Sequence, residues 1–169
     1  MRYLITIMAL LTMLFAATTH ATNQVPFKNQ ISSIIANYNR ATPQIATSGV
    51  INKGGVQILA AHGFKTIIDL RTASEGVKEE KRAVELADMH YINIPVTNAG
   101  INDDQLAAFT EAIESVETPV LIHCASGNRV GALWATYRIS KGIAQKIALE
   151  EGRTAGMRAG MEQKLRDNL

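Results

Sequence analysis

Residues 119–131 read Pro-Val-Leu-Ile-His-Cys-Ala-Ser-Gly-Asn-Arg-Val-Gly and contain the only cysteine of the 169-residue chain. An apolar run leads into Cys124, four residues follow, and Arg129 then stands where a helix can begin. The first N–H groups of a helix have no partners inside it, and the helix dipole adds partial positive charge at that end. The sequence therefore predicts a strand–loop–helix unit that gathers a thiol, a guanidinium and several amides around one point.

The residue types of this loop suit the binding of a tetrahedral oxyanion. Gly127 has no Cβ, so the backbone can approach an anion closely. Arg129 offers a planar fork of donors that fits two oxygens at once. The surrounding positive charge favours the thiolate form of Cys124, which is the nucleophilic form. We therefore predict Cys124 as a nucleophile and Arg129 as the clamp of an oxyanion loop made of Ala125, Ser126, Gly127, Asn128 and Arg129.

Several residues of the loop also have simpler interpretations. Cys124 can be a small hydrophobe at the end of a core strand. His123 is either a packed strand residue or a group that orients and tunes the cysteine from behind. Ser126 can cap the helix or donate to the thiolate, and Asn128 suits a loop or cap position. Arg129 is harder to explain structurally, because a cation at a helix N-terminus opposes the dipole.

Strand and helix patterns alternate along the chain. This order predicts an α/β fold with a central, mostly parallel sheet flanked by helices, whose ligands lie beyond the carboxyl ends of the strands. Cys124 falls at that edge. The expected strands are 47–50, 65–70, 91–96 and 120–123. The expected helices are 53–62, 75–89, 106–116 and 130–137, with one or two more from 143 to the end, and 31–38 is either a short helix or a loosely packed arm.

The first 21 residues differ from the rest of the chain. A short basic start precedes an uncharged apolar run from Leu4 to Ala17, and small residues follow around Ala21. This is the pattern of a secretory signal peptide, with an uncleaved membrane anchor as the alternative, and the apolar run is short for a membrane span. We therefore expect a periplasmic or secreted bacterial protein with no stable membrane span once the signal is removed. The predicted organisation is a signal peptide at 1–21, an N-terminal arm at 22–45 and one α/β domain at 46–169.

Composition limits the kinds of partner. There are 17 Lys and Arg against 15 Asp and Glu, a formal net charge of +2, which lacks the clear basic excess typical of nucleic-acid binding. A single cysteine excludes an internal disulfide, and a free thiol in an oxidising compartment is rarely explained by structure alone. We expect a phosphorylated substrate or a small oxyanion as the ligand, and no nucleic acid.

The Cys124 loop resembles the phosphate-binding loop of cysteine-dependent phosphatases of the tyrosine and dual-specificity type. More closely, residues 48–156 resemble the bacterial DUF442 family, the phosphatase-like domain also found attached to β-lactamase-like hydrolases. The matching stretches are 63–71, 91–96 and 121–129. The resemblance implies a phosphocysteine mechanism in which Cys124 attacks phosphorus, Arg129 and the loop amides hold the oxygens, and water releases phosphate. It implies neither a metal nor another cofactor.

Two features depart from the pattern of the resembling phosphatases. They usually place one more residue between cysteine and arginine than the four found here. A loop of this shorter length also resembles that of rhodanese-type sulfurtransferases, and Asp69-Leu70-Arg71 followed by Glu75 resembles a segment of that family. The general acid is the second departure, since Asp103 and the adjacent Asp104 are the nearest candidates, and both also suit the start of a helix. If neither reaches the site, poor leaving groups should react slowly.

Three hypotheses of function follow from these observations. The first is hydrolysis of a phosphomonoester, such as phosphotyrosine, through a phosphocysteine intermediate. The second is sulfur transfer through a persulfide on Cys124. The third is a module without catalysis that binds an anion or a partner through the same loop.

Overall fold

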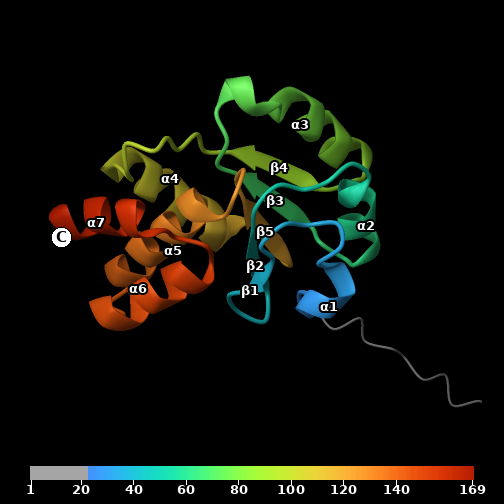
Figure 1. The fold of residues 1–169 in the computed structure, drawn as a ribbon. Coiled ribbons are helices and arrows are strands. Elements are labelled where there is room, and N and C mark those ends of the chain that lie inside the picture. Colours follow the sequence, from blue (N-terminus) through green and yellow to red (C-terminus); the bar gives the residue numbers. More distant parts are fainter. Residues whose placement is uncertain (1–22) are drawn as a thin grey trace, which may run out of the picture.

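The computed structural model describes residues 23–169, and the predicted signal peptide lies outside the described part of the chain (Figure 1). Its centre is a five-stranded sheet in the order β1-β2-β5-β3-β4. The short edge strand β1 is antiparallel to β2, and every other pair is parallel. The predicted mostly parallel α/β sheet is confirmed. The strands are β1 Asn39–Arg40, β2 Ile45–Ser48, β3 Thr66–Asp69, β4 His90–Asn93 and β5 Val120–His123.

The parallel strands end in register. His123 of β5 is paired with Ser48 of β2 on one side and with Asp69 of β3 on the other, and Asp69 is paired with Asn93 of β4. The four loops that follow these residues therefore leave from the same edge of the sheet. The Cys124 loop is one of them, which places it where ligands of parallel sheets bind.

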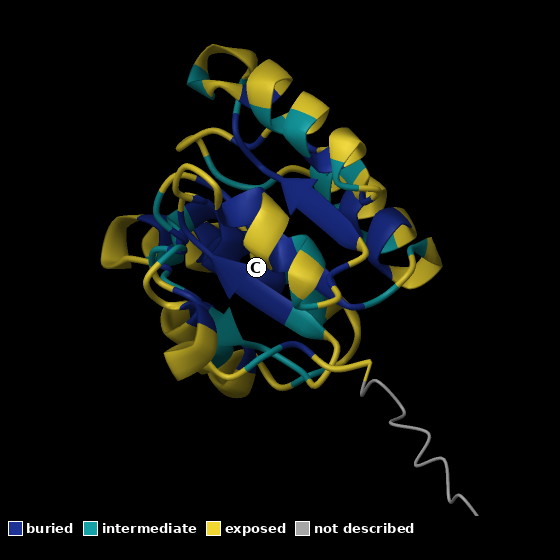
Figure 2. Ribbon diagram, turned by 90° about the vertical axis from the view of Figure 1, so that its right-hand side faces the viewer, coloured by how far each residue is buried: buried dark blue, intermediate teal, exposed yellow. Residues whose placement is uncertain are grey.

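Helices cover both faces of the sheet, and the alternation of side chains along each strand divides the core (Figure 2). Ile67 and Leu121 face a cluster that includes α2 and α3. Ile68 and Ile122 face a second cluster with α4 and α5, and α6 and α7 pack outside α5. The helices are α1 Lys28–Ile31, α2 Gly55–Ala61, α3 Val77–Leu86, α4 Asp103–Ser115, α5 Asn128–Ser140, α6 Gln145–Thr154 and α7 Ala159–Asp167, with a 3₁₀ turn, η1, at Ala73–Glu75.

The segment predicted as an arm, 22–45, packs onto the domain from its first described residues. Val25, Ile31, Ile35 and Tyr38 are buried in the same cluster as α2 and α3. Neither expectation for 31–38 describes the structure: the helix α1 ends at Ile31, and Ile35 and Tyr38 are buried in a segment that leads into strand β1. Burial of these apolar groups, rather than helical periodicity, fixes the segment. Within 23–169, none of the helices combines the length and apolar character needed to cross a membrane.

Candidate active site

The loop between β5 and α5 has the geometry that its sequence predicts. β5 ends at His123, and α5 begins at Asn128 directly after Gly127, which adopts a φ of 86°. A Cβ at Gly127 would lie 2.7 Å from the carbonyl oxygen of Ala155. Glycine is therefore required here both by the left-handed backbone and by the close approach of a neighbouring chain segment. The helix N-terminus is thereby aimed at the end of the central strand.

Cys124 lies at the floor of this loop. Its side chain is fully buried on the α4 and α5 face of the sheet, beside Ile122. The backbone N–H of Gly127 donates to its Sγ at 3.1 Å. The guanidinium of Arg129 also lies close enough to interact with the Cys124 side chain.

Arg129 is turned into the protein, with 9% of its surface exposed. Its two Nη groups bind the carboxylate of Glu75, with Nη1–Oε2 at 2.8 Å and Nη2–Oε1 at 2.6 Å. Nη1 also donates to the carbonyl oxygen of Val96 at 2.9 Å. The guanidinium is therefore fixed by the loops that follow β3 and β4, and its hydrogen bond with Glu75 is the largest cause of a raised Arg129 pKa, with Cys124 contributing as well.

The donors of Arg129 can be accounted for one by one. A guanidinium has five N–H groups. Both hydrogens of Nη1 and one of Nη2 serve Glu75, Val96 and the carbonyl oxygen of Leu70, the last at 3.4 Å from Nη1. Within residues 23–169, no oxygen accepts from Nε–H or from the second hydrogen of Nη2, and the guanidinium also interacts with the Cys124 side chain. These two donors lie parallel along one edge of the guanidinium, the edge that binds two oxygens of an oxyanion.

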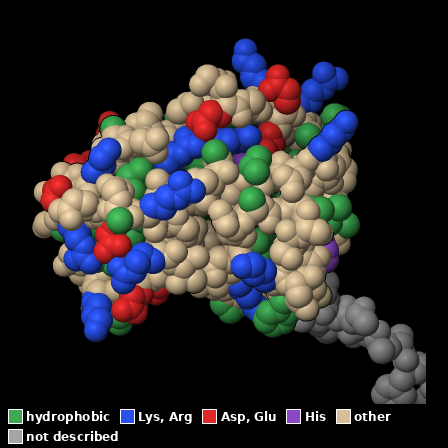
Figure 3. Space-filling view, in the orientation of Figure 1, with side chains coloured by type: hydrophobic (Ala, Val, Ile, Leu, Met, Phe, Trp, Pro, Cys, Tyr) green, Lys and Arg blue, Asp and Glu red, His purple; other side chains and the backbone are tan. Residues whose placement is uncertain are grey.

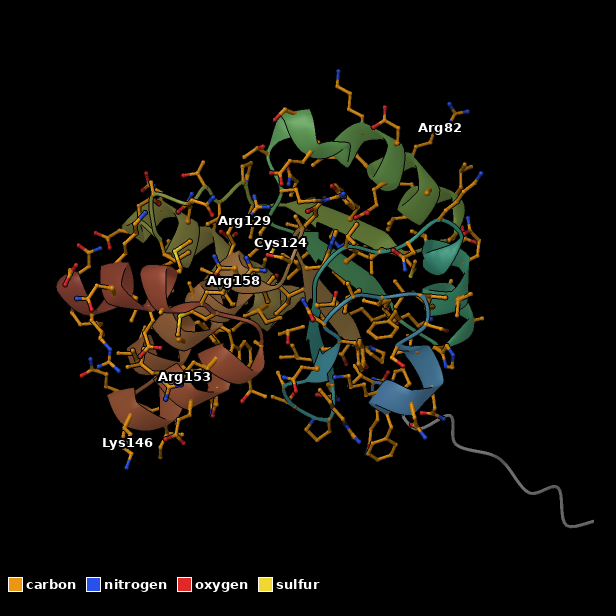
Figure 4. All side chains as sticks on the ribbon, viewed as in Figure 1. Arg82, Cys124, Arg129, Lys146, Arg153 and Arg158 are labelled. Atoms are coloured by element: carbon orange, nitrogen blue, oxygen red, sulfur yellow. The ribbon has the colours of Figure 1, made fainter. Side chains whose placement is uncertain are left out.

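A cavity of about 460 Å³ opens above the loop. It is formed by the loops that follow β3, β4 and β5 together with the segment between α6 and α7. Figure 4 shows Arg129, Cys124 and Arg158 close together on this side of the molecule. Ala125, Ser126, Asn128 and Arg129 of the predicted loop all line the cavity. The other lining residues are Thr72, Ser74, Glu75, Thr97, Asn98 and Arg158.

Glu75 is a functional residue that sequence reasoning did not assign to the site. Its hydrogen bond with Arg129 lowers its pKa to about 2, although partial burial acts in the opposite direction. The Glu75 carboxylate also accepts hydrogen bonds from the N–H and hydroxyl of Thr72 at 2.8 Å each. A group so strongly ionised positions Arg129 and is a poor proton donor near neutral pH.

His123 points away from Cys124, because adjacent strand residues project to opposite faces. Its fully buried ring lies on the α3 side, with Nε2 2.6 Å from Oε1 of Glu80 and 3.5 Å from Oδ1 of Asp69. The short contact with Glu80 lacks the geometry of a hydrogen bond, and in the described chain neither ring nitrogen has an aligned partner. His123 therefore matches the first of its two interpretations, a packed strand residue, and its ring does not face Cys124.

His123 belongs to a buried polar cluster on that face. Arg71 Nη2 lies 2.8 Å from both Asp69 Oδ2 and Glu80 Oε2, and Tyr91 Oη donates to Asp69 Oδ2 at 2.7 Å. Burial alone would raise the pKa of Asp69, but the hydrogen bonds from Arg71 and Tyr91 and the charge of His123 lower it. Asp69, Glu80 and His123 are close enough to ligate a metal ion, yet Arg71 already supplies the positive charge between the carboxylates.

Replacing Arg71 with alanine is expected to destabilise the protein by about 3–5 kcal/mol, the range for breaking a buried ion pair. The change leaves the carboxylates of Asp69 and Glu80 without their cation. The measurement is the free energy of unfolding in urea. Lys81→Ala is the control, since Lys81 and Glu85 form an exposed pair at 3.8 Å and its loss should change little. Equal stability of Arg71→Ala and the native protein would contradict this account of the cluster.

The structure does not bring Asp103 or Asp104 to the cavity above Cys124. Both lie in the first turn of α4, where the Asn102 side chain caps the helix by accepting from the N–H of Gln105 at 2.8 Å. Asp103 lines a different, smaller cavity between α4, α5 and α7. The capping arrangement therefore accounts for the acidic residues, and the proposed general acid is not supported by the geometry.

Comparison with known proteins agrees with this geometry. Residues 37–141 match the family model of the phosphatase-like domain of beta-lactamase hydrolase-like proteins. The chain belongs to this family. The beta-lactamase hydrolase-like protein of Agrobacterium fabrum is 35% identical over 104 residues, which are 58% of this chain and 24% of that protein. This phosphatase-like chain thus spans about a quarter of that relative's length.

A relative of similar size is the dual specificity protein phosphatase TpbA of Pseudomonas aeruginosa. It is 29% identical over 159 residues, 91% of this chain and 69% of TpbA. Among solved structures, a putative DUF442 phosphatase from Shewanella putrefaciens has a TM-score of 0.69 at 22% identity and covers 83% of this chain and 95% of its own. TpbA in complex with phosphotyrosine has a TM-score of 0.63 at 23% identity, covering 80% and 82%. These two structures share the fold of the phosphatase-like chain.

Proposed function

We propose that the protein hydrolyses phosphomonoesters, phosphotyrosine among them, through a phosphocysteine intermediate. The observation that carries the proposal is the free Nε and Nη2 edge of Arg129 in the loop above Cys124 Sγ. Glu75 and Val96 hold the guanidinium in place, so the edge needs no reorganisation to receive two phosphoryl oxygens. Family membership and the fold shared with a phosphotyrosine complex of TpbA support the same chemistry.

The reaction has two steps. Cys124 Sγ attacks phosphorus as a thiolate, an S–P bond forms, and the P–O bond to the leaving group breaks with its electron pair on oxygen. Water then attacks phosphorus, the S–P bond breaks, and inorganic phosphate leaves as the thiolate is restored. Arg129 and the loop amides hold the equatorial oxygens in both steps. The Gly127 N–H, which contacts sulfur in the free protein, stabilises the thiolate as nucleophile and as leaving group.

The cavity lacks an evident proton donor for the leaving oxygen. Within the described residues, Glu75 is the only carboxylate among those that line it, and its pKa of about 2 keeps it ionised. Protonation of a leaving group by a positioned acid is typically worth about 10²–10⁴-fold. We therefore expect aryl phosphates, whose leaving groups need no proton, to react about 10²–10⁴-fold faster than alkyl phosphates.

The test is hydrolysis of an aryl phosphate and an alkyl phosphate by the purified protein under reducing conditions, which keep the thiol of Cys124 from being oxidised. An acid quench during turnover of the aryl phosphate should show the mass of one phosphoryl group on the peptide that contains Cys124. Equal rates for both substrates would contradict the absence of a general acid. Conversion of thiosulfate and cyanide to thiocyanate, without phosphate release, would replace the proposal with sulfur transfer.

A further inference from the structure

A groove rich in cations continues from the cavity above Cys124. It has a volume of about 520 Å³ and shares Ser126 and Arg158 with the cavity. Its walls come from α1, β1, the end of α6 and the segment before α7. Figure 4 shows Arg153 and Arg158 on the same side of the molecule as Arg129, and Figure 3 shows Lys and Arg side chains at several places on this face. The cations that line the groove are Lys28, Arg40, Arg153 and Arg158.

The charge of the groove is not balanced by its own lining. Within the described chain, its lining contains four cations and no Asp or Glu. Arg153 is paired with Glu162 at 2.8 Å, a residue outside the groove. Arg40 binds the neutral side chain of Gln24 at 2.7 Å and lies over the ring of Phe27. For Lys28 and Arg158, the structure of residues 23–169 shows no carboxylate within ion-pair distance.

Arg158 connects the groove to the reaction site. Its backbone N–H donates to Oδ1 of Asn128, a residue of the Cys124 loop, at 2.8 Å. Its side chain is exposed and lines both the cavity and the groove. A substrate whose phosphoryl group is held by Arg129 therefore meets Arg158 first as it extends toward Lys28 and Arg40.

We propose that this groove is a second anion subsite that selects substrates with a further anionic group beside the phosphoryl group that is hydrolysed. The inference rests on the proposed phosphatase function. The second group is a carboxylate or a second phosphate, since guanidinium groups bind both. Clustered cations raise the local concentration of such substrates and hold their non-reacting part.

The experiment compares two phosphotyrosyl peptides that differ only in their flanking residues, Asp and Glu in one and Asn and Gln in the other. A second pair, an aryl bisphosphate and its monophosphate, distinguishes a phosphate from a carboxylate as the preferred group. The quantity measured is the ratio of kcat/KM within each pair, at low salt and at high salt. We expect the native protein to favour the more acidic member, and high salt to reduce that preference.

Arg158→Glu and Lys28→Glu should each lower the acidic-to-neutral ratio by about two- to fivefold, the effect of one exposed charge pair. Arg82→Glu is the matched control, because Arg82 is exposed on α3 and does not line the groove. The ratio in this control should equal that of the native protein. Turnover of both members at equal rates would overturn the subsite alone. Turnover of neither member in either pair would overturn the phosphatase proposal and the subsite with it.

Discussion

Cys124→Ser is expected to lower the hydrolysis of an aryl phosphate by at least about 10³-fold, the scale on which loss of a nucleophile acts. A serine hydroxyl stays protonated at neutral pH and is far less nucleophilic than a thiolate. Neither candidate base in the described part of the chain can activate it, because His123 projects to the opposite face of the sheet and the Glu75 carboxylate is bound to Arg129. The measurement is kcat with an aryl phosphate, beside a search for the phosphorylated peptide.

Retained binding separates a chemical defect from misfolding in this variant. Serine is close to cysteine in size, and Arg129 keeps its partners Glu75 and Val96. Cys124→Ser should therefore bind inorganic phosphate as the native protein does and unfold at a similar urea concentration. Native-like turnover by this variant would remove Cys124 from the mechanism, and with it the phosphocysteine intermediate.

Arg129→Lys is expected to lower kcat by about 10²–10³-fold, the cost of removing one preorganised donor to a developing oxyanion. Lysine keeps the positive charge and can still pair with Glu75. It lacks the parallel Nε and Nη2 donors, so it holds phosphoryl oxygens only as a point charge. The change therefore tests the shape of the clamp separately from its charge. The measurement is kcat and KM for the same aryl phosphate.

Arg138→Lys is the matched control for this substitution. Arg138 lies on the same helix, α5, and also binds a carboxylate through Nε and Nη2, that of Glu151 at 2.8 and 3.2 Å. It does not line the cavity above Cys124, so the rate should be unchanged. If Arg129→Lys were as active as Arg138→Lys, the guanidinium edge would have no part in the reaction.

The site illustrates how far local sequence patterns reach. The Cys124 loop follows from neighbouring residues, because an apolar strand, a glycine and a helix start set its course within a few positions. Glu75 lies 54 residues from Arg129 in the sequence. The residues around Glu75 do not indicate that it binds this arginine. Asp103 follows β4, the position expected of a general acid. The cap formed by Asn102 and Gln105 instead fixes it in the first turn of α4.

His123 and residues 23–45 are two further cases in which contacts between distant segments, rather than local sequence patterns, set the position of the side chains. Adjacency in sequence suggested that His123 supports Cys124, whereas the alternation of strand side chains puts it beside Glu80 and Asp69. Ile31, Ile35 and Tyr38 stand at helical spacing, but the helix α1 ends at Ile31, and packing against α2 and α3 is what places these side chains in the core.

Local patterns were enough to predict the alternating α/β order and the grouping of thiol, amides and arginine, because strand and turn preferences act over a few residues. The side of the sheet on which each strand residue lies, the carboxylate that holds Arg129 and the gathering of cations beside the cavity became visible in three dimensions alone. Those contacts join segments far apart in the chain, and their pairing is set by burial and charge in three dimensions.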